Sequence, residues 1–140
     1  MINKIVLASK SGVRKKILNQ NGIDCEVVPS NVDEDQVKES LGQESALPEI
    51  ISKNLAELKA NKVSEKIPNK LVLGADSVID LNNKLISKPK SREEALSILN
   101  QLNGKKHKLI SSVCISKNGS MIWNFTDAST LTMKQLNLDE

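Results

Sequence analysis

The sequence predicts an α/β domain, in which helices pack against a sheet. Strand-like and helix-like segments alternate along most of the chain, as expected for that class. The first segment, residues 5–8, is short and wholly apolar, which is typical of a central strand. A chain of 140 residues lies within the single-domain range, and no linker or repeat divides it.

Local signals define the elements of the first half. A helix is expected over about 11–19, with Val13, Ile17 and Leu18 on one face, and Asn21-Gly22 ends it. Residues 25–28 read as a second strand. An acidic loop is then expected to lead to Pro48, a favourable first residue for a long helix. The apolar residues at helical spacing in that helix are Ile50, Ile51, Leu55, Leu58 and Val63.

The second half contains two expected hairpins separated by a helix. A third strand at 71–73 is followed by residues 78–79 and 85–86, which flank Asn82-Asn83 and predict a hairpin. Ser91 and Glu94 form a capping box for a helix that runs to Leu102. The last two strands, roughly 108–116 and 121–133, are joined by Asn118-Gly119 in a second hairpin.

Composition disfavours several function classes. Lys and Arg exceed Asp and Glu by only three, and the basic residues are spread along the chain, which disfavours a nucleic-acid or membrane surface. One Phe, one Trp and no Tyr provide few aromatics for stacking bases. No apolar run approaches the length of a membrane span, so we expect a cytoplasmic protein. Cys25 and Cys114 fall in strand-like segments and are expected to be buried thiols.

Hydroxyl residues and cations follow the first strand. Ser9, Ser11, Arg14 and Lys15 occur where this strand gives way to a helix, whose free N–H groups and dipole favour an anion. The dipole disfavours cations in a first turn, so a bound anion would compensate them. The segment therefore predicts a phosphate site. In an equally good alternative, Ser11 only caps the helix and the cations are solvated.

A carboxylate, Asp76, follows the third strand and Gly74-Ala75. This position predicts an acid at the carboxyl end of a buried strand, beside small residues that let a ligand approach. Such a carboxylate can hold Mg²⁺ or Mn²⁺ and orient or deprotonate a water, or it can simply cap a turn. The acids Asp33, Glu34 and Asp35 would matter only if the fold brings them near Asp76.

Three other polar residues have ordinary default roles. Lys88 precedes Pro89, which favours extended backbone and holds the lysine at the mouth of the first hairpin. Lys59 lies on the long helix, where a lysine is usually solvated. His107 is the only histidine and opens a strand, where a structural role is commoner than a catalytic one.

Taken in order, these motifs resemble the Maf family of nucleoside triphosphate pyrophosphatases. The family pattern is a strand followed by Ser-x-Ser-Pro-x-Arg, Asp-Glu, Gly-Ala-Asp-Thr, Gly-Lys-Pro and Leu-x-Gly-x-x-His. The ordered set is far more specific than any single piece. The corresponding segments here are Ser9-Lys10-Ser11-Gly12-Val13-Arg14, Val32-Asp33-Glu34, Gly74-Ala75-Asp76-Ser77, Ser87-Lys88-Pro89 and Leu102-Asn103-Gly104-Lys105-Lys106-His107.

The resemblance implies an elongated mixed sheet flanked by helices, a Maf/ITPase-like fold with a nucleotide cleft, and a homodimer. It implies hydrolysis of a nucleoside triphosphate to the monophosphate and pyrophosphate with Mg²⁺ or Mn²⁺, removing non-canonical or modified nucleotides. Asp76 would accept the proton from water, Glu34 would share the metal with it, and Lys88 would complete the catalytic set by contacting phosphate. The substrate-binding residues implied are Ser9, Ser11, Val13, Arg14, Lys59 and Ser77.

The chain also departs from the family pattern. Gly12 replaces the usual Pro, and Ser77 replaces Thr. Val13 occupies a position that is Arg in members acting on thymidine and uridine triphosphates, so that specificity is not expected here. Residues 1–140 are expected to form one Maf-like domain that lacks the family's C-terminal portion. A catalytically impaired remnant that at most binds nucleotide is therefore the alternative, and a basic RNA-binding module is a distant third.

Overall fold

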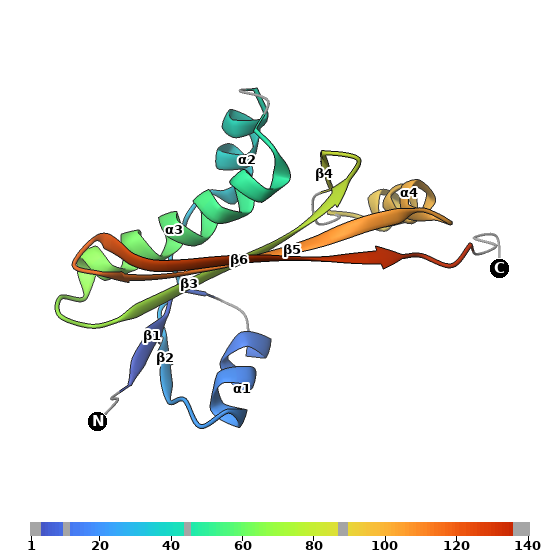
Figure 1. The fold of residues 1–140 in the computed structure, drawn as a ribbon. Helices are drawn as coiled ribbons and strands as arrows, with labels where there is room; N and C mark the ends of the chain where they lie inside the picture. Colours follow the sequence, from blue (N-terminus) through green and yellow to red (C-terminus); the bar gives the residue numbers. More distant parts are fainter. Residues whose placement is uncertain (1–3, 10–11, 44–45, 87–89, 136–140) are drawn as a thin grey trace.

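A six-stranded mixed sheet forms the centre of the computed structural model (Figure 1). The structure describes residues 4–9, 12–43, 46–86 and 90–135. The strand order is β2-β1-β3-β5-β6, and β4 pairs only with β3. The elements in chain order are β1 (Ile5–Leu7), α1 (Gly12–Gln20), β2 (Cys25–Val27), α2 (Glu34–Gln43), α3 (Pro48–Lys66), β3 (Val72–Leu81), β4 (Lys84–Ile86), α4 (Arg92–Leu102), β5 (Lys106–Lys117) and β6 (Ser120–Thr132).

The sheet is elongated because three of its strands are much longer than the rest. Strand β1 pairs in parallel with β2 and β3, whereas β3, β5 and β6 form an antiparallel arm. In Figure 1 helix α3 crosses one side of this arm, α1 lies on the other side, and α4 lies beside β4 toward its far end. The mixed sheet flanked by helices that the sequence predicted is thus confirmed.

The core lies between α3 and the sheet. Its buried residues come from β1, α3, β3 and β5, and include Val6, Ala60, Val72 and Cys114. Both cysteines are buried and free, as expected, and burial raises the pKa of the Cys114 thiol. Among the described residues, no helix is long and apolar enough to cross a membrane.

Turn and cap chemistry predicted several element boundaries correctly. Asn82 and Asn83 both have positive φ in the β3–β4 hairpin, and Asn118 and Gly119 do so in the β5–β6 hairpin, as a two-residue turn of this kind requires. The Ser91 hydroxyl accepts a hydrogen bond from the backbone N–H of Glu94 at 3.1 Å, which caps α4. These boundaries depend on local interactions, which is why the sequence alone shows them.

The prediction of an acidic loop between the second strand and Pro48 was wrong, because residues 34–43 form helix α2. Asp33 caps this helix: its carboxylate accepts a hydrogen bond from the backbone N–H of Gln36 at 3.1 Å. The acids of its first turn also complement the helix dipole. The acidic run is therefore the start of a helix, which fixes the direction in which Glu34 projects.

The prediction that the third strand ends before Asp76 was also wrong. Strand β3 continues without interruption from Val72 to Leu81, so Asp76 lies in the middle of a strand and pairs with Ser112 of β5. Gly74 does not admit a ligand. A Cβ atom at Gly74 would collide with the carbonyl oxygen of Ala56 and would lie 2.8 Å from the backbone nitrogen of Ala60. The glycine instead lets α3 approach the sheet closely.

We expect Gly74→Ala to lower the free energy of unfolding by about 1–3 kcal/mol, because the added methyl group forces α3 away from the sheet. Gly42→Ala in α2 is the matched control. A Cβ atom there meets nothing within 4 Å, so that substitution should raise the stability by roughly 0.5–1 kcal/mol. Urea titrations of the three proteins measure both effects. Equal stability of the two variants would contradict the close contact.

Candidate functional site

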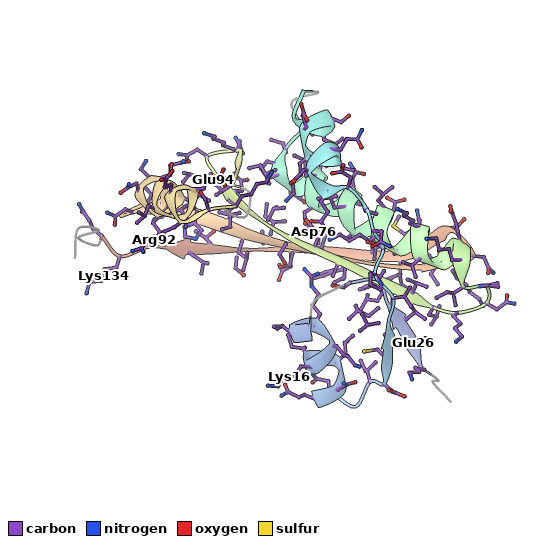
Figure 2. All side chains as sticks on the ribbon, turned by 180° about the vertical axis from the view of Figure 1, so that it is seen from behind. Lys16, Glu26, Asp76, Arg92, Glu94 and Lys134 are labelled. Atoms are coloured by element: carbon purple, nitrogen blue, oxygen red, sulfur yellow. The ribbon has the colours of Figure 1, made fainter. Side chains whose placement is uncertain are left out.

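Asp76 is a buried carboxylate at the centre of the molecule, where β3 passes helix α3 (Figure 2). Only 5% of its surface is exposed. Burial raises the pKa of Asp76, the ammonium of Lys59 opposes this, and the nearby Glu34 adds to it; the net shift is upward. A carboxylate with a raised pKa inside a pocket is a characteristic feature of functional sites.

The partner of Asp76 is a lysine that is buried as well. The ammonium nitrogen Nζ of Lys59 lies 3.3 Å from Oδ1 of Asp76 and 2.5 Å from Oε1 of Glu34. It also donates a hydrogen bond to the carbonyl oxygen of Ala75 at 3.2 Å. One ammonium group therefore joins α3, α2 and β3. The expectation of a solvated Lys59 is wrong, because only 6% of its surface is exposed.

The second oxygen of Asp76 is available for another ligand. Oδ2 is buried and has no hydrogen-bond partner among the described residues. The hydroxyl of Ser52, which is fully buried, donates a hydrogen bond to the backbone carbonyl of Asp76 at 3.2 Å and holds this part of β3 against α3. A buried acceptor without a donor is costly, so a water or a cation is the expected occupant of this side of the carboxylate.

A pocket of about 690 Å³ opens in front of this group. It is lined by the end of β1, the segment 30–33 and the first turns of α1 and α2, in addition to Lys59 and Asp76. The fold therefore brings together motifs that are far apart in the sequence. The sequence-predicted site residues that line the pocket are Ser9, Arg14, Glu34, Lys59, Asp76 and Ser77.

The β1–α1 end of the pocket carries the predicted hydroxyl and guanidinium groups. Ser9 is buried, and its hydroxyl accepts a hydrogen bond from Arg14 at 3.2 Å. Arg14 lies in the first turn of α1, where the free N–H groups of the helix also favour an anion. This end can therefore contact phosphate oxygens with both neutral and charged donors.

The other residues considered from the sequence differ in their placement. Ser11 and Lys88 lie outside the described residues. Val13 is 68% exposed and does not line the pocket. Ser77 lines the pocket, and its hydroxyl lies 3.1 Å from that of Ser111 on β5. His107 lines a separate pocket with Asp80, and its Nδ1 atom has no partner in the described part of the chain.

The three neighbouring acids have different roles. Asp33 caps α2, whereas Asp35 forms an exposed ion pair with Lys90 at 3.2 Å. Only Glu34 is joined to Asp76 through Lys59. These acids were expected to matter only if the fold brought them near Asp76, and Glu34 meets this condition.

Sequence reasoning missed other residues that line the pocket. Ser30 and Asn31 come from the segment before α2, and Lys38 comes from α2 itself. The Asp33 cap was the sequence signal that could have identified Lys38. A helix that begins at Glu34 places residue 38 one turn later on the same face. No local signal predicted that Asn31 would adopt a positive φ of 56°.

The residues present are compatible with a divalent cation. Carboxylate oxygens are the ligands that Mg²⁺ and Mn²⁺ prefer, and Mg²⁺ is often held by only one or two carboxylates together with waters and substrate phosphates. Asp76 offers a buried oxygen without a partner, and Glu34 lines the same pocket. In the described ranges no group of three or more His, Cys, Asp or Glu side chains gathers, so substrate would have to complete such a site.

The fold and the site together define an α/β protein with a pocket of about 690 Å³ built on a buried carboxylate–lysine pair. Residues 4–140 match the family described as Maf-like protein, and the chain belongs to this family.

Two curated relatives illustrate the similarity. The chain is 68% identical over 136 residues to the nucleoside triphosphate pyrophosphatase of Pelagibacter ubique (strain HTCC1062), covering 97% of this chain and 70% of the relative. It is 36% identical over 136 residues to the 7-methyl-GTP pyrophosphatase of Brucella abortus biovar 1 (strain 9-941), covering 97% of this chain and 68% of the relative.

A solved structure shares the fold. The Ham1 protein of Staphylococcus aureus superimposes with a TM-score of 0.60 at 18% identity, covering 93% of this chain and 71% of that protein. At this identity the likeness supports the architecture alone. The Maf/ITPase-like fold expected from the sequence is thereby confirmed.

We expect Lys59→Met to lower the free energy of unfolding by about 3 kcal/mol, because it leaves Asp76 buried without its counter-charge. The double variant Lys59→Met/Asp76→Asn should recover a large part of this loss, since it also removes the buried charge. Chemical denaturation of the single and double variants measures the coupling. If the two substitutions were simply additive, the ion pair would not be the cause.

A second expectation concerns pH. The pKa of Asp76 is raised above its ordinary value of 3.8 in the folded protein, so ionisation of this group costs stability as the pH rises from that value through the raised pKa. Asp76→Asn cannot ionise. It should therefore unfold at a higher temperature than the wild type at neutral pH without divalent cations, and the difference should shrink toward pH 4. A constant difference across this range would contradict the raised pKa.

Proposed function

We propose that this protein hydrolyses a nucleoside triphosphate between its α and β phosphates, giving the nucleoside monophosphate and pyrophosphate. The supporting observation is the group Glu34–Lys59–Asp76 inside a pocket whose other end presents Ser9 and Arg14. A base for water and donors for phosphate thus share one cavity. The curated relatives named above are pyrophosphatases, that is, hydrolases acting on acid anhydrides.

Asp76 is the proton acceptor in this proposal. A water oxygen attacks the α-phosphorus, its proton passes to the Asp76 carboxylate, and the bond between the α-phosphorus and the bridging oxygen breaks as pyrophosphate leaves with the electron pair. The raised pKa of Asp76 suits this task, because a base is most effective when its pKa lies nearer the working pH. Lys59 keeps the carboxylate ionised and fixes its orientation.

Charge stabilisation comes from the remaining groups. Arg14 presents a planar set of donors that matches phosphate oxygens, and Ser9 holds it in place. Glu34 and Asp76 would hold Mg²⁺ or Mn²⁺, which supplies charge neutralisation for the triphosphate when bound.

The substrate range is a further part of this proposal. Val13 lacks the guanidinium that family members acting on thymidine and uridine triphosphates carry at this position, and it is exposed outside the pocket, so we do not extend that preference to this chain. One relative is named for a modified nucleotide, 7-methyl-GTP. We therefore place modified or non-canonical nucleotides first among the substrates to be assayed.

The test is product analysis with wild type and three variants. Wild type with Mg²⁺ or Mn²⁺ should release monophosphate and pyrophosphate in equal amounts, and Asp76→Asn should lower kcat by roughly 10²–10⁴-fold with the fold retained. Arg14→Lys should restore only part of the activity lost in Arg14→Ala, because an ammonium cannot reproduce the guanidinium fork. Release of diphosphate and phosphate, or full activity of Asp76→Asn, would exclude this mechanism.

A further inference from the structure

Among the described residues that line the pocket, the cation Lys38 has no part in the site described above. Lys38 lies on α2, four residues after Glu34, and lines the pocket together with it. Its side chain is half-buried rather than fully solvated. Lys38 also lines a neighbouring cavity of about 630 Å³ between α2, β4 and α4, so it stands at the border between the two spaces.

The other charged groups at the pocket already have partners within the protein. Glu34 and Asp76 share Lys59, Asp33 caps α2, Asp35 pairs with Lys90, and Arg14 donates to Ser9. Lys38, by contrast, makes no hydrogen bond or ion pair with any residue in the described ranges. A lysine held partly out of water beside a cavity, without a counter-charge in contact, is suited to an anionic ligand.

The position of Lys38 relative to the reacting centre supports the same conclusion. Lys38 lines the same pocket as Asp76 and Glu34. Lys59 is closer to Asp76, but its charge is already used by two carboxylates. A triphosphate brings several negative charges into the pocket, and Lys38 is a described lining cation for which the structure shows no contact with a carboxylate.

We propose that Lys38 is a further substrate-binding residue, which contacts the polyphosphate of the nucleotide from α2 while Arg14 contacts it from α1. This inference rests on the proposed function. It assigns the two cations to opposite walls of one pocket, so that the chain of phosphates is held between two helices. It also gives α2 two tasks, because the same helix face carries Glu34.

Equilibrium binding tests this assignment without requiring turnover. The probes are a nucleoside triphosphate whose α and β phosphates are joined by a methylene group, and inorganic tripolyphosphate, each measured by calorimetry with Mg²⁺ present. Lys38→Met should weaken binding of both probes by at least about tenfold, the loss expected for one charge-assisted hydrogen bond. Lys38→Arg should stay within roughly threefold of wild type, since the positive charge is kept.

Lys53→Met is the matched control. Lys53 is an exposed lysine on α3 that lines none of the described pockets, so its loss should leave both affinities unchanged. Thermal melts should show that both methionine variants remain folded, because methionine is a good helix former.

The outcomes separate the two proposals. If wild type binds the analogue and Lys38→Met binds it equally well, the assignment of Lys38 is wrong while the proposed hydrolysis stands. If wild type binds the analogue and Lys38→Met does not, but no triphosphate is hydrolysed, Lys38 is confirmed and the proposed function fails. If Lys53→Met weakened binding equally, the effect would come from general surface charge and the assignment of Lys38 would be wrong. If wild type bound neither probe, both proposals would be overturned.

Discussion

The burial of one ammonium group between two carboxylates is the constraint on which this structure depends. Lys59 can lose its hydration only because Glu34, Asp76 and the carbonyl of Ala75 replace the water. Each partner belongs to a different segment, so α2, α3 and β3 must all be in place before the charge is compensated. The pair therefore specifies the arrangement of the site more than it stabilises the fold, since an apolar core of the same volume would be at least as stable.

Asp76 shows how the sheet serves this constraint. Because β3 is continuous, the backbone of Asp76 is fixed by its pairing with Ser112 of β5 within a rigid strand. Gly74 brings α3 close, and Ser52 holds the carbonyl of Asp76 from that helix. The close packing that stabilises the core is thus also what places Lys59 within reach of the carboxylate. The same helix–sheet contact therefore stabilises the core and positions the reacting groups.

The parts of the fold that the sequence predicted are those determined by neighbouring residues. The turns at Asn82-Asn83 and Asn118-Gly119 require positive φ, and the Ser91 cap is a local hydrogen bond. Helix α2 was missed because its cap, Asp33, is hidden in an acidic run. The burial of Lys59 could not be predicted, since a lysine on a helix is solvated unless distant carboxylates reach it, and only the tertiary fold brings them there.

The attachment of α2 has a consequence for how long the site persists. No described side chain of this helix is fully buried, and its contacts within the fold are mainly with α3, through the Glu34–Lys59 pair and half-buried residues such as Val37 and Leu41. Few buried apolar contacts mean a low free energy of local opening. Detachment of α2 would separate Glu34 from Lys59 while the sheet stayed intact. The chain would then lose its reactive arrangement through a partial opening, well before the cooperative unfolding of the core, and amide hydrogen exchange would be fast in α2 and slow in β3.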